Sequence, residues 1–163
     1  MPTKSLWKSI SDASRRSVNF DILLNNLQGA ESTIVGMRRL TQSQILHVLK
    51  VMPAGSIDFY EWIGAASECI GTSTHQKIYS FGIGENAPCC IGSANLDALS
   101  FVWDSEDLLV IQDPEFKKQF DLMLKKDFAS PYSQKITITE LENRSFLEKV
   151  QEYLANKFLR NFL

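Results

Sequence analysis

Three short apolar runs between residues 76 and 113 constrain the possible folds most strongly. They are QKIYSFGIG, APCCIGSANL and DLLVIQD, and turn-forming residues bound each of them. Apolar runs of this length, separated by turn residues, are typical of buried strands rather than of helices. We therefore expect the three strands to lie together at the centre of one sheet.

The segments on either side add two more strands and the helices that would cover the sheet. Residues 5–17 and 41–52 repeat apolar residues at helical spacing, with Thr41 or Ser43 as the cap of the second helix, whereas NFDILLNN and SIDFYEWIG are typical of strands. Pro114 begins a further helix. This order predicts an α/β fold in which helices cover both faces of a mixed sheet.

The last segment, residues 138–163, has the apolar periodicity of an amphipathic helix. The residues on its apolar side are Phe146, Val150, Tyr153, Leu154, Phe158 and Phe162. A helix of this kind either packs against the sheet or lies on a membrane surface. We expect it to pack against the sheet.

Composition and charge exclude several classes of protein. The 163 residues suit a single domain, 1–163, and a net charge of −2 gives no electrostatic footprint for nucleic acid. The first twenty residues lack the apolar core of a secretory signal, and no run of eighteen apolar residues predicts a membrane span. Three cysteines do not make an even disulfide framework. These features favour a cytoplasmic protein, with peripheral contact to a membrane left open.

Five polar residues have the chemistry required to act on a phosphodiester. Such a bond resists attack because it is anionic, so a site must neutralise the non-bridging oxygens and present a nucleophile in line with the leaving group. His75 and Lys77 are two residues apart on an extended segment, so their side chains lie on the same face. Ser93 and Asn95 can donate hydrogen bonds to phosphate oxygens. Glu106 can accept the second imidazole N–H of the histidine.

The same residues resemble a known motif. HQK, GSANLDALSF and DSEDLLVIQDPEF are similar to the second half of a phospholipase D superfamily protein, nearest in wording to the cardiolipin synthase-like members. The resemblance covers most of the chain, with the motif in residues 74–106 and C-terminal helices in 114–163. It implies one half of an α/β/α sandwich and a phosphohistidine at His75, without metal or cofactor. It also implies that Lys77 and Asn95 bind phosphate oxygens and that Glu106 orients the histidine.

The chain departs from the family pattern at three positions. Gly82 stands where the motif has aspartate, and Glu85 is the nearest carboxylate to it. Leu99 replaces the arginine of the motif, and Asp104 replaces the asparagine of its Asn-x-Glu segment. Asp104 would add negative charge near a bound phosphate. These changes affect the expected rate more than the expected fold.

Family enzymes bring two such motifs face to face, and this chain contains one. Its other histidine, His47, falls in a helix and has no lysine at the required spacing. A complete site would need a homodimer or a partner chain that supplies the second motif.

Three functions remain open on this reasoning. The first is a phosphodiesterase or phosphatidyltransferase that acts on a phospholipid. The second is a degenerate or truncated domain that serves as an interaction or membrane-associated subunit, and the third is a single-motif nuclease. A zinc site built from Cys69, His75, Cys89 and Cys90 is disfavoured because adjacent cysteines on a strand point to opposite faces. We expect Cys89 and Cys90 to be core residues.

Overall fold

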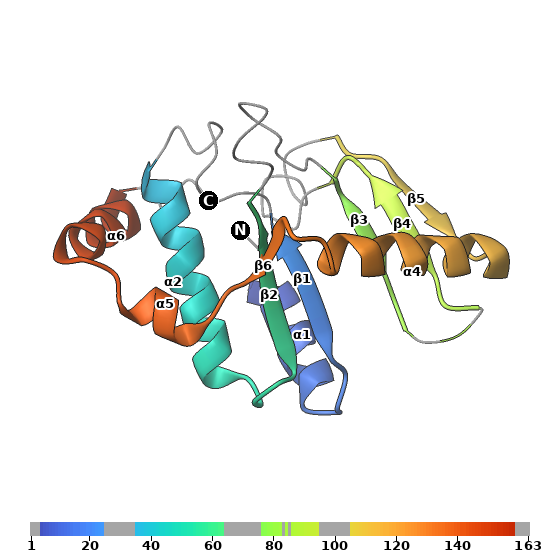
Figure 1. The fold of residues 1–163 in the computed structure, drawn as a ribbon, viewed down its shortest axis with the longest axis horizontal. Coiled ribbons are helices and arrows are strands. Elements are labelled where there is room, and N and C mark those ends of the chain that lie inside the picture. The colour runs from blue at the N-terminus through green and yellow to red at the C-terminus, as the bar shows by residue number, and fades with distance from the viewer. Residues whose placement is uncertain are drawn as a thin grey trace.

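The computed structural model describes residues 4–24, 35–63, 76–82, 84, 86–94 and 105–158 of the chain. Helices and strands are mixed along this part of the sequence, which confirms the α/β class (Figure 1). The helices are α1 (Lys4–Ser14), α2 (Val35–Val51), α4 (Pro114–Phe128), α5 (Ile138–Glu142) and α6 (Phe146–Phe158). The strands are β1 (Phe20–Leu24), β2 (Ile57–Trp62), β3 (Ile78–Ser80), β4 (Cys89–Gly92), β5 (Leu108–Ile111) and β6 (Ser133–Lys135).

The described strands form two sheets of three strands each. The first has the order β1-β2-β6 and is mixed, because β1 runs parallel and β6 antiparallel to β2. The second has the order β3-β4-β5 and is antiparallel throughout. The expectation that β3, β4 and β5 lie together is confirmed, but they form a sheet of their own and not the centre of one shared with β1 and β2. Both hydrogen-bonding edges of β2 are occupied, by β1 and by β6, so none of the three can pair with β2.

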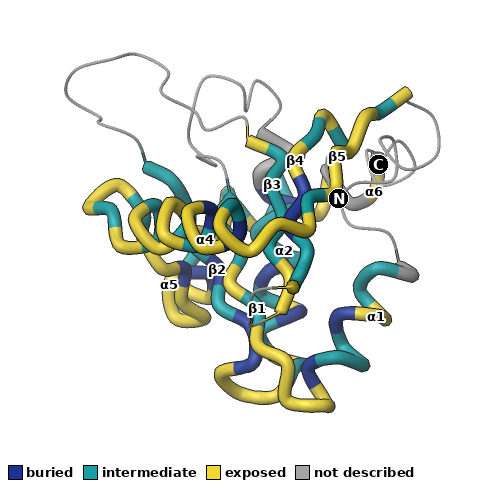
Figure 2. The backbone as a smooth tube through the Cα atoms, turned by 90° about the vertical axis from the view of Figure 1, so that its right-hand side faces the viewer, coloured by how far each residue is buried: buried dark blue, intermediate teal, exposed yellow. Residues whose placement is uncertain are grey.

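The main core lies on one face of the mixed sheet. Ile57 and Phe59 alternate along β2 and are buried against Ile10 of α1 and against Ile45 and Val48 of α2. This is the pattern expected of a strand with one face in the core. In Figure 2, buried positions appear on β2, α1 and α2, whereas α4 and β5 are largely exposed.

Helix α4 contacts both sheets, and it meets β2 on the side opposite the main core. Near its end, the Phe128 ring meets the Tyr60 ring of β2 edge to face, with centroids 5.0 Å apart. In its middle, the Asp121 carboxylate accepts a 2.7 Å hydrogen bond from the Ser80 hydroxyl of β3. The helix begins as predicted, with Pro114 in its first turn and the Asp113 side chain as its cap. Figure 1 shows α4 in front of the sheet of β3, β4 and β5, with one end close to β1.

Helix α2 begins earlier than the sequence pattern predicted. It starts at Val35, so Thr41 and Ser43 lie inside the helix and neither of them caps it. The additional first turns contain Arg39 and Leu40, which are both buried. Tertiary burial of these two side chains therefore extends the helix beyond its periodic apolar segment.

The C-terminal segment forms two helices instead of one. Thr137 and Glu140 make a capping box at the start of α5. Ser145 and Glu148 exchange the same pair of hydrogen bonds at the start of α6, at 2.8 and 3.3 Å. The prediction that this segment packs against the sheet is wrong for α6, which packs against α2. The side chain of Phe158 and all of Phe162 lie outside the described residues.

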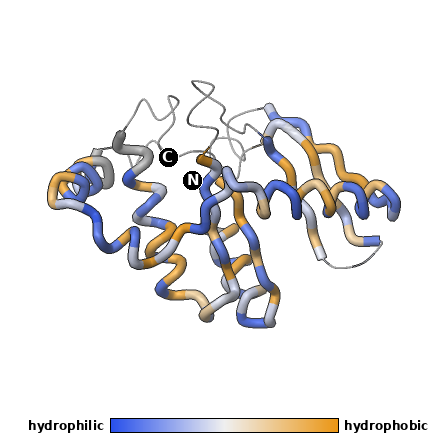
Figure 3. Tube along the Cα trace, viewed as in Figure 1, coloured by the Kyte–Doolittle hydropathy of each residue, from blue (hydrophilic) through white to orange (hydrophobic). Residues whose placement is uncertain are grey.

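Apolar residues are concentrated on the strands, and the helices alternate between polar and apolar positions (Figure 3). Among the helices that the structure describes, none combines the length and the apolar composition needed to cross a bilayer.

Candidate active site

One end of the antiparallel sheet brings three of the predicted site residues together. Lys77 directly precedes β3, Ser93 directly follows β4, and Glu106 lies two residues before β5. Because β4 runs antiparallel to both of its neighbours, the start of β3, the end of β4 and the start of β5 meet at one edge. We call this place the motif edge and define it by Lys77, Gly92, Ser93, Glu106 and Asp107.

Backbone hydrogen bonds fix the three chain segments at the motif edge. The Gly92 N–H donates to the Lys77 carbonyl at 3.0 Å, and the Ser93 N–H donates to the Asp107 carbonyl at 3.0 Å. The Asp107 N–H in turn donates to the Ser93 hydroxyl oxygen at 3.0 Å. The hydroxyl hydrogen of Ser93 still has to find an acceptor, and the side chain is exposed. Ser93 can therefore hold the sheet together and donate to a phosphate oxygen at the same time.

Gly92 has a steric role at this edge. A Cβ atom at this position would overlap the Asp107 carbonyl oxygen and lie 3.1 Å from both the Asp107 carbonyl carbon and the Leu108 Cα. A glycine at such a place can permit close approach of the backbone to a ligand. The backbone that approaches it in the structure is that of the neighbouring strand, so Gly92 sets the spacing of β4 and β5.

A side chain of β3 anchors Ala94, the second residue after β4. The Tyr79 hydroxyl donates a 2.6 Å hydrogen bond to the Ala94 carbonyl. Tyr79 is two residues after Lys77 along the β3 segment. The sequence pattern predicted no function for it. Tyr79 thus holds in place Ala94, the residue that precedes Asn95 in the sequence.

Several predicted site residues lie outside the described part of the chain. They are His75, Asn95, Glu85, Leu99 and Asp104, together with Cys69. Gln76, Ala94 and Ser105 are the described residues next in sequence to His75, Asn95 and Asp104. Their roles stay predictions.

Gly82, the position of the missing aspartate, is at the other end of β3. It has a φ of 68°, in the left-handed region that favours glycine, and it belongs to the connection between β3 and β4. Gly82 is five positions after Lys77, and an extended chain of this length spans about 16 Å. An aspartate at this position would therefore not face the motif edge, and its loss removes no carboxylate from that edge.

A carboxylate from α4 occupies this far end of the sheet. Asp121 accepts hydrogen bonds from the Ser80 hydroxyl at 2.7 Å and from the buried Lys117 ammonium at 2.5 Å. Burial raises the pKa of the Asp121 carboxyl, but the hydrogen bonds from Lys117 and Ser80 outweigh it and lower the pKa below its ordinary value. Sequence reasoning missed this pair, although Lys117 and Asp121 stand at the i,i+4 spacing of a helical ion pair.

The adjacent cysteines of β4 are core residues, as predicted. Cys89 is fully buried and Cys90 nearly so, and both are free thiols. Burial, together with the neighbouring Cys89, raises the pKa of the Cys90 thiol, which keeps it protonated and unreactive near neutral pH. In the described ranges, no group of three or more histidine, cysteine or acidic side chains could hold a metal ion.

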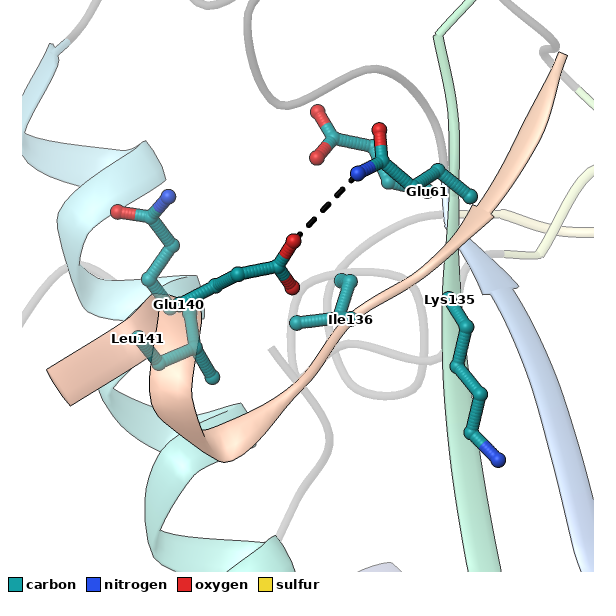
Figure 4. Close-up of a pocket in the computed structure, with 7 residues that line it drawn as sticks. Glu61, Lys135, Ile136, Glu140 and Leu141 are labelled. Carbon is teal, nitrogen blue, oxygen red and sulfur yellow. Dashed lines mark hydrogen bonds between the residues drawn. The ribbon is translucent and has the colours of Figure 1, made fainter. Parts of the chain in front are cut away.

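A pocket in the described structure lies away from the motif edge. It has a volume of about 170 Å³ between β2, β6 and α5, and its lining includes Glu61, Ile136 and Glu140 (Figure 4). The Gln134 side chain donates a 3.4 Å hydrogen bond to the Glu140 carboxylate across it. None of the motif residues that the structure describes lines this pocket.

Comparison with known proteins gives one match. The family model described as "Cardiolipin synthase, PLD-like domain" matches residues 1–128, which is more than three quarters of the chain. No curated protein and no solved structure matches.

Proposed function

Because the chain belongs to the family of cardiolipin synthase, phospholipase D-like domains, we propose that it cleaves a phosphodiester bond of a phospholipid. The phosphatidyl group then passes to water or to an alcohol. The motif edge is the observation that supports this best, since a cation, a hydroxyl and a carboxylate lie there on neighbouring strand ends. The acidic chain has no basic footprint for a nucleic acid, which favours a lipid substrate.

The proposed reaction has two steps. In the first, the His75 imidazole attacks phosphorus, an N–P bond forms, and the P–O bond to the leaving group breaks. Lys77, Ser93 and Asn95 stabilise the charge on the non-bridging oxygens, and Glu106 accepts the second imidazole N–H. In the second step, water or an alcohol attacks phosphorus and gives its proton to a second histidine, the N–P bond breaks, and His75 is regenerated.

The leaving oxygen needs a proton in the first step, and a second histidine would supply it. His47 is exposed on α2 and is not followed by a lysine at the spacing of the motif. We propose that a second copy of this chain, or a separate chain, contributes the second motif.

We also propose that residues 1–163 form one domain, although the family match ends at residue 128. Strand β6 pairs with β2, and α5 and α6 pack against α2. An ion pair of 2.6 Å between Lys50 and Glu142 joins α2 to α5. The residues beyond the match thus contact the matched part through both a strand and helices.

Intact-protein mass spectrometry tests the proposed nucleophile. The protein is mixed with a phospholipid substrate and quenched without acid, because phosphohistidine is labile to acid and stable to base. We expect an adduct on the wild type and on His47→Ala, the matched histidine control, and no adduct on His75→Ala. The mass of the complex in solution, measured on the same samples, reports whether two copies assemble.

A folded protein that forms no adduct with phospholipid would refute the lipid reaction. An adduct with an oligonucleotide alone would assign the chain to the nucleases. If neither substrate gives an adduct, alone or with added partner chains, the degenerate domain remains, and Leu99 and Asp104 are the substitutions that favour it.

A further inference from the structure

Helix α6 packs against α2 through its polar face. The Arg39 side chain, only 8% exposed, forms a 2.7 Å ion pair with Glu148 and donates a 3.2 Å hydrogen bond to the Gln151 side chain. Arg144, before the helix, forms a 3.0 Å ion pair with Glu152. The face of α6 that points into the protein is therefore built from charged and amide groups.

The opposite face of α6 is apolar and exposed. Phe146 is 83% exposed, Leu147 65%, Tyr153 64% and Leu154 47%. Their spacing of one, seven and eight residues places them, with the half-buried Val150, along one side of the helix. A helix on a globular protein normally has the reverse orientation, with its apolar side towards the core. Figure 1 shows α6 at one end of the molecule, beyond α2, so no other described element covers its outer side.

The hydrogen bonds at the start of α6 fix this orientation. The Glu148 carboxylate accepts hydrogen bonds from the backbone and the side chain of Ser145, at 2.8 and 3.0 Å, as well as pairing with Arg39. Turning the helix to bury its apolar side would break the capping box and leave the buried Arg39 without its carboxylate. The exposed apolar face is thus a consequence of the polar contacts made behind it.

The charges on α6 indicate what the apolar face binds. Its two acidic residues, Glu148 and Glu152, lie towards buried arginines, whereas Lys149 and Lys157 are exposed. The outer half of the helix therefore combines apolar side chains with positive charge. The sequence continues as LRNFL, which adds apolar residues and one arginine.

A second copy of the chain fits this face poorly. If two α6 helices paired in antiparallel fashion about Tyr153, Lys149 of one copy would face Lys157 of the other. Like charges placed opposite one another oppose association. A bilayer with anionic headgroups is complementary to both properties of the face.

We propose that α6 binds to the surface of membranes that contain anionic phospholipid, with Phe146, Leu147, Tyr153 and Leu154 inserted at the boundary between headgroups and acyl chains. This is a binding property, and it does not depend on the proposed catalytic function.

Sedimentation with vesicles tests the proposal on the full chain. The vesicles are phosphatidylcholine, with or without phosphatidylglycerol. We expect binding to the anionic vesicles, and we expect the double variant Phe146→Ser with Leu154→Ser to lower the partition coefficient by about tenfold or more. Leu122→Ser, at a 51% exposed leucine of α4, is the matched control and should bind like the wild type.

A charge variant tests the electrostatic part. Lys149→Glu should weaken binding to anionic vesicles only, whereas Lys118→Glu, at an exposed lysine of α4, should have little effect. Circular dichroism and the thermal midpoint show whether each variant is folded, and the substituted side chains are exposed, so we expect little change. His75→Ala should bind vesicles as the wild type does, which separates this proposal from the catalytic one.

Three results would overturn the proposal. One is a wild-type protein that binds neither kind of vesicle. Another is binding that the double variant on α6 leaves unchanged. The third is self-association that this double variant abolishes while vesicles are not bound, which would make the face a contact between copies.

Discussion

Replacing Gly92 with alanine tests the packing of the motif edge. The added methyl group would overlap the Asp107 carbonyl oxygen and lie 3.1 Å from the Leu108 Cα, so β4 and β5 must separate at this point. The obstacle is backbone, which cannot rotate away as a flexible side chain can. We expect the two hydrogen bonds between Ser93 and Asp107 to be lost.

The expected cost follows from these contacts. Two lost hydrogen bonds contribute about 2 kcal/mol, and the strain of overpacking adds about 1–3 kcal/mol. The free energy of unfolding, measured in urea, should therefore fall by about 3–5 kcal/mol. Hydrogen exchange at the Ser93 and Asp107 amides should become faster, because both lose their acceptors.

Gly55→Ala is the matched control. Gly55 has a φ of 74°, and a Cβ added there would meet no atom within 4 Å, so its replacement should cost only about 1–2 kcal/mol, from the left-handed backbone. A Gly92→Ala protein within about 0.5 kcal/mol of the wild type, or more stable than Gly55→Ala, would refute the steric reasoning. Unchanged exchange at the two amides would refute it as well.

Three further predictions concern other parts of the fold. Arg39→Met should lower the free energy of unfolding, measured in urea, by about 2 kcal/mol. This loss is smaller than that for breaking a fully buried ion pair, because the Glu148 side chain is 29% exposed. Burial and the neighbouring Asp58 raise the pKa of the Asp21 carboxyl in the folded protein above its ordinary value of 3.8. The stability of the fold therefore falls as the pH rises from the pKa of the unfolded chain through the pKa of the folded protein. Asp21→Asn should therefore raise the thermal midpoint at about pH 7 and have little effect near pH 3. A chain that ends at residue 128 lacks β6, one of the two partners of β2, and it lacks α5 and α6, which pack on α2. Circular dichroism during heating should therefore show no cooperative unfolding.

The sequence predicted those elements whose pattern is local. Ile57 and Phe59 alternate along β2 as a half-buried strand requires, and Pro114 follows the capping Asp113 of α4. Strand β6 was missed because its residues, SQK, have neither apolar alternation nor β-branched side chains. It is a strand because β2 offers it an unpaired edge, and tertiary pairing of this kind leaves no trace in the local sequence.

The break between α5 and α6 did have a local signal. Each helix begins with a hydroxyl residue followed three positions later by glutamate, at Thr137 and at Ser145. The apolar periodicity runs across both helices, and it concealed the second capping box. The same periodicity predicted that the apolar side of α6 faces inward. The polar side faces inward instead, because Glu148 pairs with Arg39. Arg39 lies far away in the sequence, so the local pattern could not indicate this contact.

The motif edge was predictable in part. The sequence predicted Lys77 and Glu106 on strands and Ser93 where a strand ends, and the antiparallel order of the strands brings these positions together. Sequence could not show that Gly92 accommodates Asp107, since the contact depends on how closely two strands approach. Nor could it place Gly82 at the opposite end of β3, because that requires knowing where the strand ends.

The late position of β6 in the chain has a consequence for biosynthesis. Strand β2 receives one neighbour from β1, which a ribosome has already made, and the other only when Ser133–Lys135 emerges. At about 5–20 residues per second, the second edge of β2 waits for several seconds with its backbone N–H and C=O groups unpaired. An open strand edge of this kind is a site for aggregation or for chaperone binding. Nascent chains that stall between Trp62 and Ser133 should therefore be the ones that depend most on chaperones.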